Sequence, residues 1–145
     1  MKYQIINIKT IVTDNDLEAG LSFFEGEHDI PFKIERLYCV YENKKLKGFH
    51  PNKQSGQLMF CPYGAIEILV DDGDRREAVL LNSPSVGIIL PPGIWREITW
   101  KKSDSVLCVA ASGHYEPEKL QDNYELYIEA VRSRKITKQK NVLEG

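Results

Sequence analysis

The chain has 145 residues, of which 42% are hydrophobic and 28% charged, and its formal net charge is −2. This length fits one domain that can bury a hydrophobic core, and the composition is that of an ordinary globular protein. Without a basic excess the chain does not suit general nucleic-acid binding, and no apolar run approaches the roughly 18 residues that a membrane span needs.

Short apolar or β-branched runs, separated by turns, extend over most of the chain. Turn sequences such as ENKKLKG, DDGD, NSPS and PPG separate the runs. A spacing of roughly 8–12 residues, without a helical pattern between the runs, predicts an antiparallel sandwich or barrel. The predicted strands cover residues 4–12, 32–42, 57–63, 65–72, 77–82, 86–92, 96–100 and 105–112.

One helix is predicted near the C-terminus, within residues 117–135, where Pro117 suits the first turn. Its apolar stripe should pack on the outside of the barrel or on a partner chain. The sequence therefore predicts one β-rich domain over residues 1–134, followed by a polar, frayed tail over residues 135–145. The apolar side chains at helical spacing are Leu120, Tyr124, Ile128 and Val131.

The three cysteines, Cys39, Cys61 and Cys108, lie in the apolar runs LYCVY, MFCPY and VLCVA. No CxxC spacing is present, so we interpret all three as buried core thiols rather than as metal ligands or nucleophiles. The odd count and the lack of a signal peptide favour a reducing compartment, and we expect a cytoplasmic protein.

Two glycine-bounded segments resemble the two motifs of the cupins: GFHPNKQSGQLMFCPYG and, about 23 residues later, GIILPPGIWRE. Metal-binding cupins have His-x-His and a later carboxylate in the first motif, and a third histidine in the second motif, PxGxxH. The resemblance implies an all-β fold, the cupin double-stranded β-helix or jelly roll, with a C-terminal α-helix.

The positions of the cupin metal ligands are mostly occupied by other residue types in this chain. His50 holds the first position and Asn52 the second, Gly56 and Gln57 fall where the carboxylate would be, and Arg96 replaces the last histidine. A guanidinium stays protonated and cannot ligate. We therefore expect a cupin without a metal.

A closer resemblance extends from about Ile5 to Ile128. The segments IPFKIERLY, KGFHPNK, LNSPSVGIILPPGIWRE and VAASGHYEPEKLQDNYELYI resemble, in order and spacing, those of the sugar nucleotide 3,4-ketoisomerases, the WxcM-like cupins. This implies an isomerase, working without a cofactor, that moves the keto group of a dTDP-4-keto-6-deoxyhexose from C4 to C3 in deoxysugar synthesis for a surface polysaccharide such as O-antigen. It also implies a homodimer in which the N-terminal strand QIINIKTIV pairs across the interface.

Two departures from this family bear on activity. The family usually reads GxHAHK, with two histidines, where this chain has Asn52 in the second position and Pro51 before it. The family's D-x-R-G-x-L stretch is replaced by DLEAGLSFF, which has no arginine. The first departure concerns catalysis, and the second concerns sugar contacts and the stereochemistry of the product, which the sequence leaves open.

The keto shift needs a base of near-neutral pKa to remove the C3 proton and a hydrogen-bond donor for the enediolate. We expect His50 to be this base. Asn52, on the same face if the segment is an extended strand, could bind a sugar oxygen or orient a water. Tyr38 could relay a proton or donate to the oxyanion, and it shares strand parity with Arg36.

Five further residues are candidates for binding the substrate: Arg36, Lys53, Gln57, Trp95 and Arg96. The basic residues could meet a pyrophosphate or be ordinary surface charges. Gln57 could contact the sugar or make a cross-strand hydrogen bond, and packing explains Trp95 better than base stacking. Two other functions stay open: a non-catalytic nucleotide-sugar-binding paralogue, suggested by Asn52, and a metal-free cupin of the 3,5-epimerase type.

Overall fold

The computed structural model describes residues 3–12, 20–41, 47–49, 55–114 and 124–144. Within these residues the chain forms eleven strands and one helix, so the predicted succession of short strands followed by a helix is confirmed. The elements are β1 (Gln4–Asn7), β2 (Lys9–Val12), β3 (Gly20–Phe23), β4 (Arg36–Val40), β5 (Lys47–Phe49), β6 (Gln57–Tyr63), β7 (Ile66–Asp71), β8 (Arg76–Leu81), β9 (Val86–Leu90), β10 (Trp95–Trp100), β11 (Val106–Ala111) and α1 (Tyr124–Glu144).

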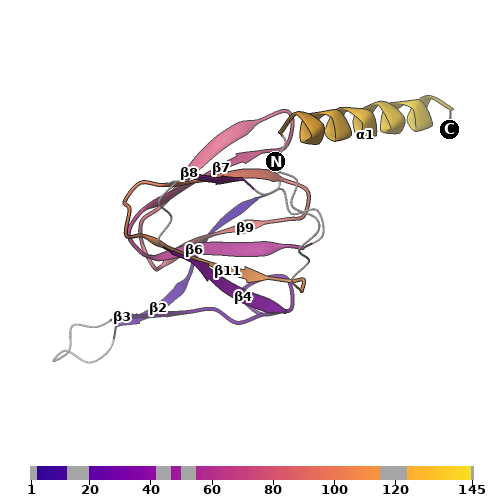
Figure 1. Cartoon of the computed structure of the whole chain (residues 1–145). Helices are drawn as coiled ribbons and strands as arrows, with labels where there is room; N and C mark the ends of the chain where they lie inside the picture. The colour runs from indigo at the N-terminus through magenta and orange to yellow at the C-terminus, as the bar shows by residue number, and fades with distance from the viewer. Residues whose placement is uncertain (1–2, 13–19, 42–46, 50–54, 115–123, 145) are drawn as a thin grey trace.

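Nine of these strands form two antiparallel sheets that face each other as the walls of a barrel (Figure 1). One sheet has the order β1-β9-β6-β11-β4 and the other the order β5-β10-β7-β8. Alternate residues of each strand point between the sheets, as Ile66, Ile68 and Val70 of β7 do, and all three are fully buried. The main core of the protein is therefore the barrel interior.

The outer face of the five-stranded sheet is partly covered by the segment that precedes β4. Phe24 and Ile30 from this segment pack with Leu58, Phe60 and their neighbours into a second, smaller apolar cluster. The rings of Phe24 and Phe60 meet edge to face, with centroids 5.3 Å apart. The five-stranded sheet therefore has one apolar cluster on its outer face and the main core on its inner face.

The N-terminal run QIINIKTIV forms two strands rather than the single one that we predicted. Ile8 separates them: its side chain is buried, and its backbone amide donates to the Ser85 carbonyl at 2.7 Å. β1 pairs with β9, whereas β2 turns away and pairs with β3 in a hairpin that projects from the barrel (Figure 1). Ile11 and Leu21 of this hairpin are about half exposed, at 53% and 49%.

The C-terminal helix α1 docks by its first turns at one end of the barrel and then runs past it (Figure 1). We expected residues 135–145 to be a frayed tail, but the helix continues to Glu144. The segment KITKQKNVLE contains no glycine or proline, and its lysines, glutamine, leucine and glutamate are good helix formers, so its polarity was a poor guide to disorder. No helix within the described residues is long and apolar enough to cross a membrane.

Candidate active site

A chain of polar side chains lies inside the barrel, among residues that are otherwise apolar. It is built from Tyr38 on β4, Gln57 at the start of β6 and Arg96 on β10. Along β10 the side chains alternate, so that Arg96 shares the inward face with Ile98 and Trp100. Arg96 and Gln57 are both buried, with exposures of 0% and 4%.

Hydrogen bonds join these three side chains in one direction. Arg96 Nη1 donates to Gln57 Oε1, and Gln57 Nε2 donates to the Tyr38 hydroxyl at 3.2 Å. The other side of the guanidinium donates to the Ile94 carbonyl, with Nη2 at 3.2 Å and Nε at 3.4 Å. Because the Tyr38 oxygen accepts from Gln57, its own proton can be donated to a substrate oxygen.

The electrostatics of this chain keep Arg96 charged and Tyr38 neutral near pH 7. Burial lowers the pKa of Arg96 to about 10, and the nearby hydroxyls of Tyr38 and Tyr127 oppose that shift. Burial also raises the pKa of Tyr38, against the opposing effect of Arg96 and Arg36. The partners described for the Arg96 guanidinium are all neutral, so the site presents a buried positive charge suited to an anion.

Arg36 adds a second cation beside the tyrosine. Its guanidinium carbon lies 4.9 Å from the centroid of the Tyr38 ring. The strand parity predicted for Arg36 and Tyr38 is therefore confirmed. Four of the sequence-predicted site residues, Arg36, Tyr38, Gln57 and Arg96, come together in one cluster.

The remaining predicted residues do not belong to this described cluster. His50, Asn52 and Lys53 lie outside the described residues. The strand that leads to them, β5, pairs with β10 so that Phe49 is opposite Glu97, the residue after Arg96. Trp95 faces the other side of β10, where its buried ring packs edge-on to Tyr124 of α1, with centroids 5.2 Å apart. This is the packing role that we favoured for Trp95, and it does not place the ring in the barrel interior.

Tyr127 is a residue of the cluster's surroundings that the sequence did not single out. It is buried, and its hydroxyl lies 2.9 Å from the Gly93 carbonyl and 3.0 Å from the Asp71 carbonyl. Gly93 precedes Ile94, whose carbonyl holds Arg96. Helical spacing indicated an apolar stripe through Tyr124, Ile128 and Val131, and Tyr127 lies on the same helix face, three residues after Tyr124, so this spacing could have found it.

Metal ligation finds no support in the part of the chain that the structure describes. Within it there is no group of three or more His, Cys, Asp or Glu side chains that could hold a metal ion. Arg96, at the position of the cupins' last histidine, is engaged with Gln57 and the Ile94 carbonyl. The expectation of a cupin without a metal stays a prediction because His50 is outside the described residues.

Two facing antiparallel sheets, with the polar side chains of the candidate site gathered between them, define the protein as a cupin. The family model described as FdtA: WxcM-like, C-terminal matches residues 1–132, and the chain belongs to this family. The resemblance to the sugar nucleotide 3,4-ketoisomerases is thereby confirmed.

Named relatives agree with this assignment. The chain is 32% identical over 140 residues to the TDP-4-oxo-6-deoxy-alpha-D-glucose-3,4-oxoisomerase of Aneurinibacillus thermoaerophilus, covering 93% of this chain and 99% of that protein. A 3,4-ketoisomerase from Helicobacter canadensis has a TM-score of 0.83 at 28% identity, over 91% of this chain and 98% of its own. QdtA, a sugar 3,4-ketoisomerase from Thermoanaerobacterium thermosaccharolyticum solved in complex with TDP, has a TM-score of 0.79 at 31% identity, over 91% and 96% of the two chains.

Proposed function

We propose that this protein moves the keto group of a TDP-linked 4-keto-6-deoxyhexose from C4 to C3 through an enediolate. The observation that carries the proposal is the buried guanidinium of Arg96, bonded to Gln57 and backed by neutral partners at the centre of the barrel. A fixed positive charge in a water-poor site stabilises charge that develops in a transition state. The relatives named above, with their TDP-sugar names and the TDP complex, support the substrate class.

In this proposal His50 removes the C3 proton, and the negative charge moves to O4 as the enediolate forms. Arg96 and the proton of Tyr38 stabilise that oxygen. Tyr38 can give a proton to O4 and take one back from O3, after which His50 returns its proton to C4. The atoms balance without any oxidant or reductant, as an isomerisation requires. Asn52 would orient the sugar or a water beside His50.

The nucleotide end of the substrate needs cations of its own. We assign this role to Arg36 and Lys53, because the fully buried Arg96 faces the barrel interior where the sugar would sit. Arg36→Ala should weaken TDP binding by roughly 1.5–3 kcal/mol if it makes a charge-assisted hydrogen bond to phosphate. Isothermal calorimetry that finds an unchanged affinity would return Arg36 to a structural role over the Tyr38 ring.

Proton NMR of the protein with TDP-4-keto-6-deoxyglucose in D2O tests the reaction directly. Migration of the keto group is the expected result. Binding without exchange would support the non-catalytic paralogue, which Asn52 suggests. Deuterium exchange at C3 and C5 without migration would support an epimerase-type cupin.

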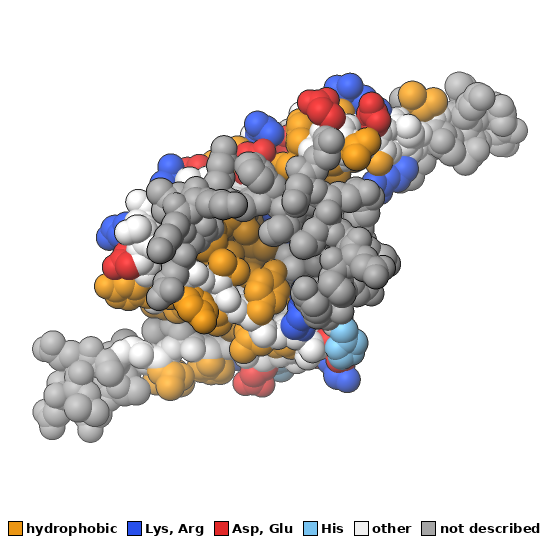
Figure 2. All heavy atoms as spheres, viewed as in Figure 1, with side chains coloured by type: hydrophobic (Ala, Val, Ile, Leu, Met, Phe, Trp, Pro, Cys, Tyr) orange, Lys and Arg blue, Asp and Glu red, His pale blue; other side chains and the backbone are white. Residues whose placement is uncertain are grey.

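Assembly and location belong to the same proposal. We expect a homodimer that forms through the N-terminal strands. We also expect the enzyme to act in the cytoplasm, in the synthesis of a deoxysugar for surface polysaccharide. Hydrophobic side chains are exposed on the projecting hairpin of β2 and β3 (Figure 2), and Ile5 on β1 is 57% exposed. Such an open strand and hairpin favour pairing with a second copy. A monomer by light scattering at micromolar concentration would contradict the dimer.

A further inference from the structure

Two of the three cysteines face each other across neighbouring strands. Cys39 of β4 is the register partner of Cys108 of β11, and their sulfur atoms are 3.0 Å apart. We predicted that all three thiols would be buried. Cys61 is, at 1% exposure, but Cys39 is exposed and Cys108 is half-buried. The difference arises because Cys39 and Cys108 alternate with the inward residues Tyr38 and Val109 and so lie on the outer face of the sheet.

The backbone geometry of this pair suits a covalent bond. Directly opposite residues of antiparallel strands have Cα atoms about 4.5–5.5 Å apart. Disulfides span Cα separations of about 4.4–6.8 Å, so the strands need not move to bring the sulfurs together. Cys61 is a built-in contrast, because it points into the barrel core and its thiol bonds the Tyr63 carbonyl at 3.2 Å.

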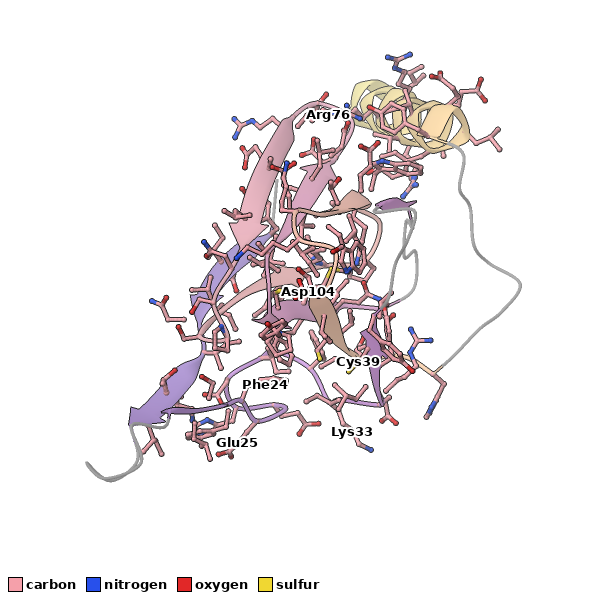
Figure 3. The ribbon with its side chains drawn as sticks, turned by 60° about the vertical axis from the view of Figure 1, so that its left-hand side comes forward. Phe24, Glu25, Lys33, Cys39, Arg76 and Asp104 are labelled. Atoms are coloured by element: carbon pink, nitrogen blue, oxygen red, sulfur yellow. The ribbon has the colours of Figure 1, made fainter. Side chains whose placement is uncertain are left out.

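We propose that Cys39 and Cys108 are a redox-modification site, at which a peroxide converts the two thiols into a reversible cross-strand disulfide. Cys39, labelled in Figure 3, is the more exposed of the two thiols and meets the oxidant. Its thiolate displaces hydroxide from the peroxide and becomes a sulfenic acid, with release of one water. Cys108 then gives up its proton as its sulfur attacks that of Cys39, an S–S bond replaces the S–O bond, and the displaced hydroxide takes the proton and leaves as a second water. A dithiol reductant reverses the bond by thiol–disulfide exchange.

The half-buried position of Cys108 sets the order of these steps. Burial, together with the hydrogen bond to Cys39, raises the pKa of Cys108 to about 12. Cys108 therefore stays protonated while Cys39 reacts with the oxidant, and it acts second as the resolving thiol.

The bond would fasten a strand that carries part of the candidate site. β4 lies at the edge of the five-stranded sheet and is paired there with β11. Arg36 and Tyr38 project from β4 into the barrel, and Tyr38 is the neighbour of Cys39. The disulfide would close a long loop between β4 and β11 and so oppose the opening of this edge.

Peroxide treatment followed by alkylation and peptide mass spectrometry tests the site. The folded protein should lose two of its three alkylatable thiols, yield one linked peptide pair containing Cys39 and Cys108, and regain both thiols with dithiothreitol. Cys61 should remain alkylatable after unfolding, as an internal control. Amide hydrogen exchange of β4 should slow in the oxidised protein.

Two matched variants keep the test decisive. Cys108→Ser should leave Cys39 to oxidise to sulfenic and sulfinic acid without a linked peptide and without slower exchange in β4. Cys61→Ser should form the bond as the unaltered protein does. The proposal is overturned if Cys108 remains alkylatable after Cys39 has oxidised. It is also overturned if a non-reducing gel shows that the disulfide links two different chains.

Discussion

The guanidinium of Arg96 donates to the side-chain oxygen of Gln57, and both side chains are buried between the two sheets. This bond fixes the orientation of the glutamine amide, so that its NH2 group points to the hydroxyl of Tyr38. Arg96 on β10 thus sets the direction of the hydrogen bonds that run through Gln57 to the hydroxyl of Tyr38, which can donate a proton.

Replacing both Arg96 and Gln57 should lower activity without lowering stability. The lowered pKa of Arg96, about 10 against an ordinary 12.5, corresponds to a burial cost on the order of 3 kcal/mol at neutral pH. The double variant Arg96→Met, Gln57→Met removes the buried charge. It also removes the Gln57 side-chain oxygen, which would otherwise be left without its hydrogen-bond donor. We expect the double variant to be at least as stable to heat as the unaltered protein, with turnover lower by about 10²–10³-fold. Arg96→Met alone should be less stable than the double variant, because Gln57 Oε1 loses its buried donor. A double variant that unfolds below the single one would contradict this account.

The pH dependence of turnover should show one ionisation, on the acid side. In the proposed mechanism His50 acts as a base only when neutral, so kcat should fall on the acid side as the imidazole becomes protonated. The pKa of Tyr38 is raised and that of Arg96 is about 10, so neither side chain changes charge between pH 7 and about 9. Tyr38→Phe should lower kcat by about 10²-fold or more while the acid limb keeps its midpoint. A decline in kcat between pH 7 and 9 would assign the chemistry to a different group.

Changing His50 tests the base directly. His50→Asn should depress turnover by about 10²–10⁴-fold while TDP affinity stays near that of the unaltered protein. Asn52→His should raise the rate if Asn52 handicaps a two-histidine mechanism, and should leave it unchanged or lower it if Asn52 fits a different sugar. Full activity in His50→Asn, measured by the NMR assay, would show that the base lies elsewhere.

The hydroxyl of Tyr127 should act on catalysis through Arg96. Tyr127→Phe removes the contacts to the Gly93 and Asp71 carbonyls, so the turn that precedes Ile94 should loosen. We expect kcat to fall several-fold with little change in the KM for the nucleotide sugar. The matched control is Tyr124→Phe, which loses a 2.6 Å bond to the Asp71 carboxylate and should affect stability alone, by about 0.5–1.5 kcal/mol.

A double-mutant cycle separates positioning from simple destabilisation. In an Arg96→Lys background, Tyr127→Phe should have no further effect on kcat, because the guanidinium group that Tyr127 positions is already absent. Additive losses in kcat would mean that Tyr127 acts on the barrel as a whole and not on Arg96.

Metal content is the simplest measurement. Elemental analysis of the purified protein should find no stoichiometric transition metal, and chelators should leave turnover unchanged, because Asn52, Gln57 and Arg96 stand where ligands would be. One metal per chain would overturn this expectation.

The strands of the barrel were predictable because their apolar runs are bounded by strong turn sequences. The short strands β3 and β5 were not, because four residues of GLSF and three of KGF carry little periodicity of their own. Their pairing with β2 and β10 makes them strands. The break at Ile8 was equally invisible, since it depends on a bond to Ser85, far along the chain.

The candidate site divides in the same way. Period-2 alternation placed Arg36 and Tyr38 on one side of β4, which is a local property. The contact between Gln57 and Arg96 joins strands of two different sheets, so it follows from how the sheets face each other. Likewise, the inward side of each strand could not be told from the outward side at Cys39 and Cys108, since both faces of that sheet carry apolar residues.

Alternation along β10 gives protein engineers an indirect route to the site. Trp95 packs against Tyr124, Tyr127 and Ile128 in the first turns of α1, while its neighbour Arg96 faces the interior. Arg76, labelled in Figure 3, lies over the Tyr124 ring at the same end of the barrel. If β10 rotates to accommodate a repacked helix, the guanidinium of Arg96 must turn as well, because Trp95 and Arg96 are consecutive residues of that strand. Libraries of substitutions confined to the helix surface that covers Trp95 should therefore yield variants with altered sugar preference, although none of the changed residues touches the sugar.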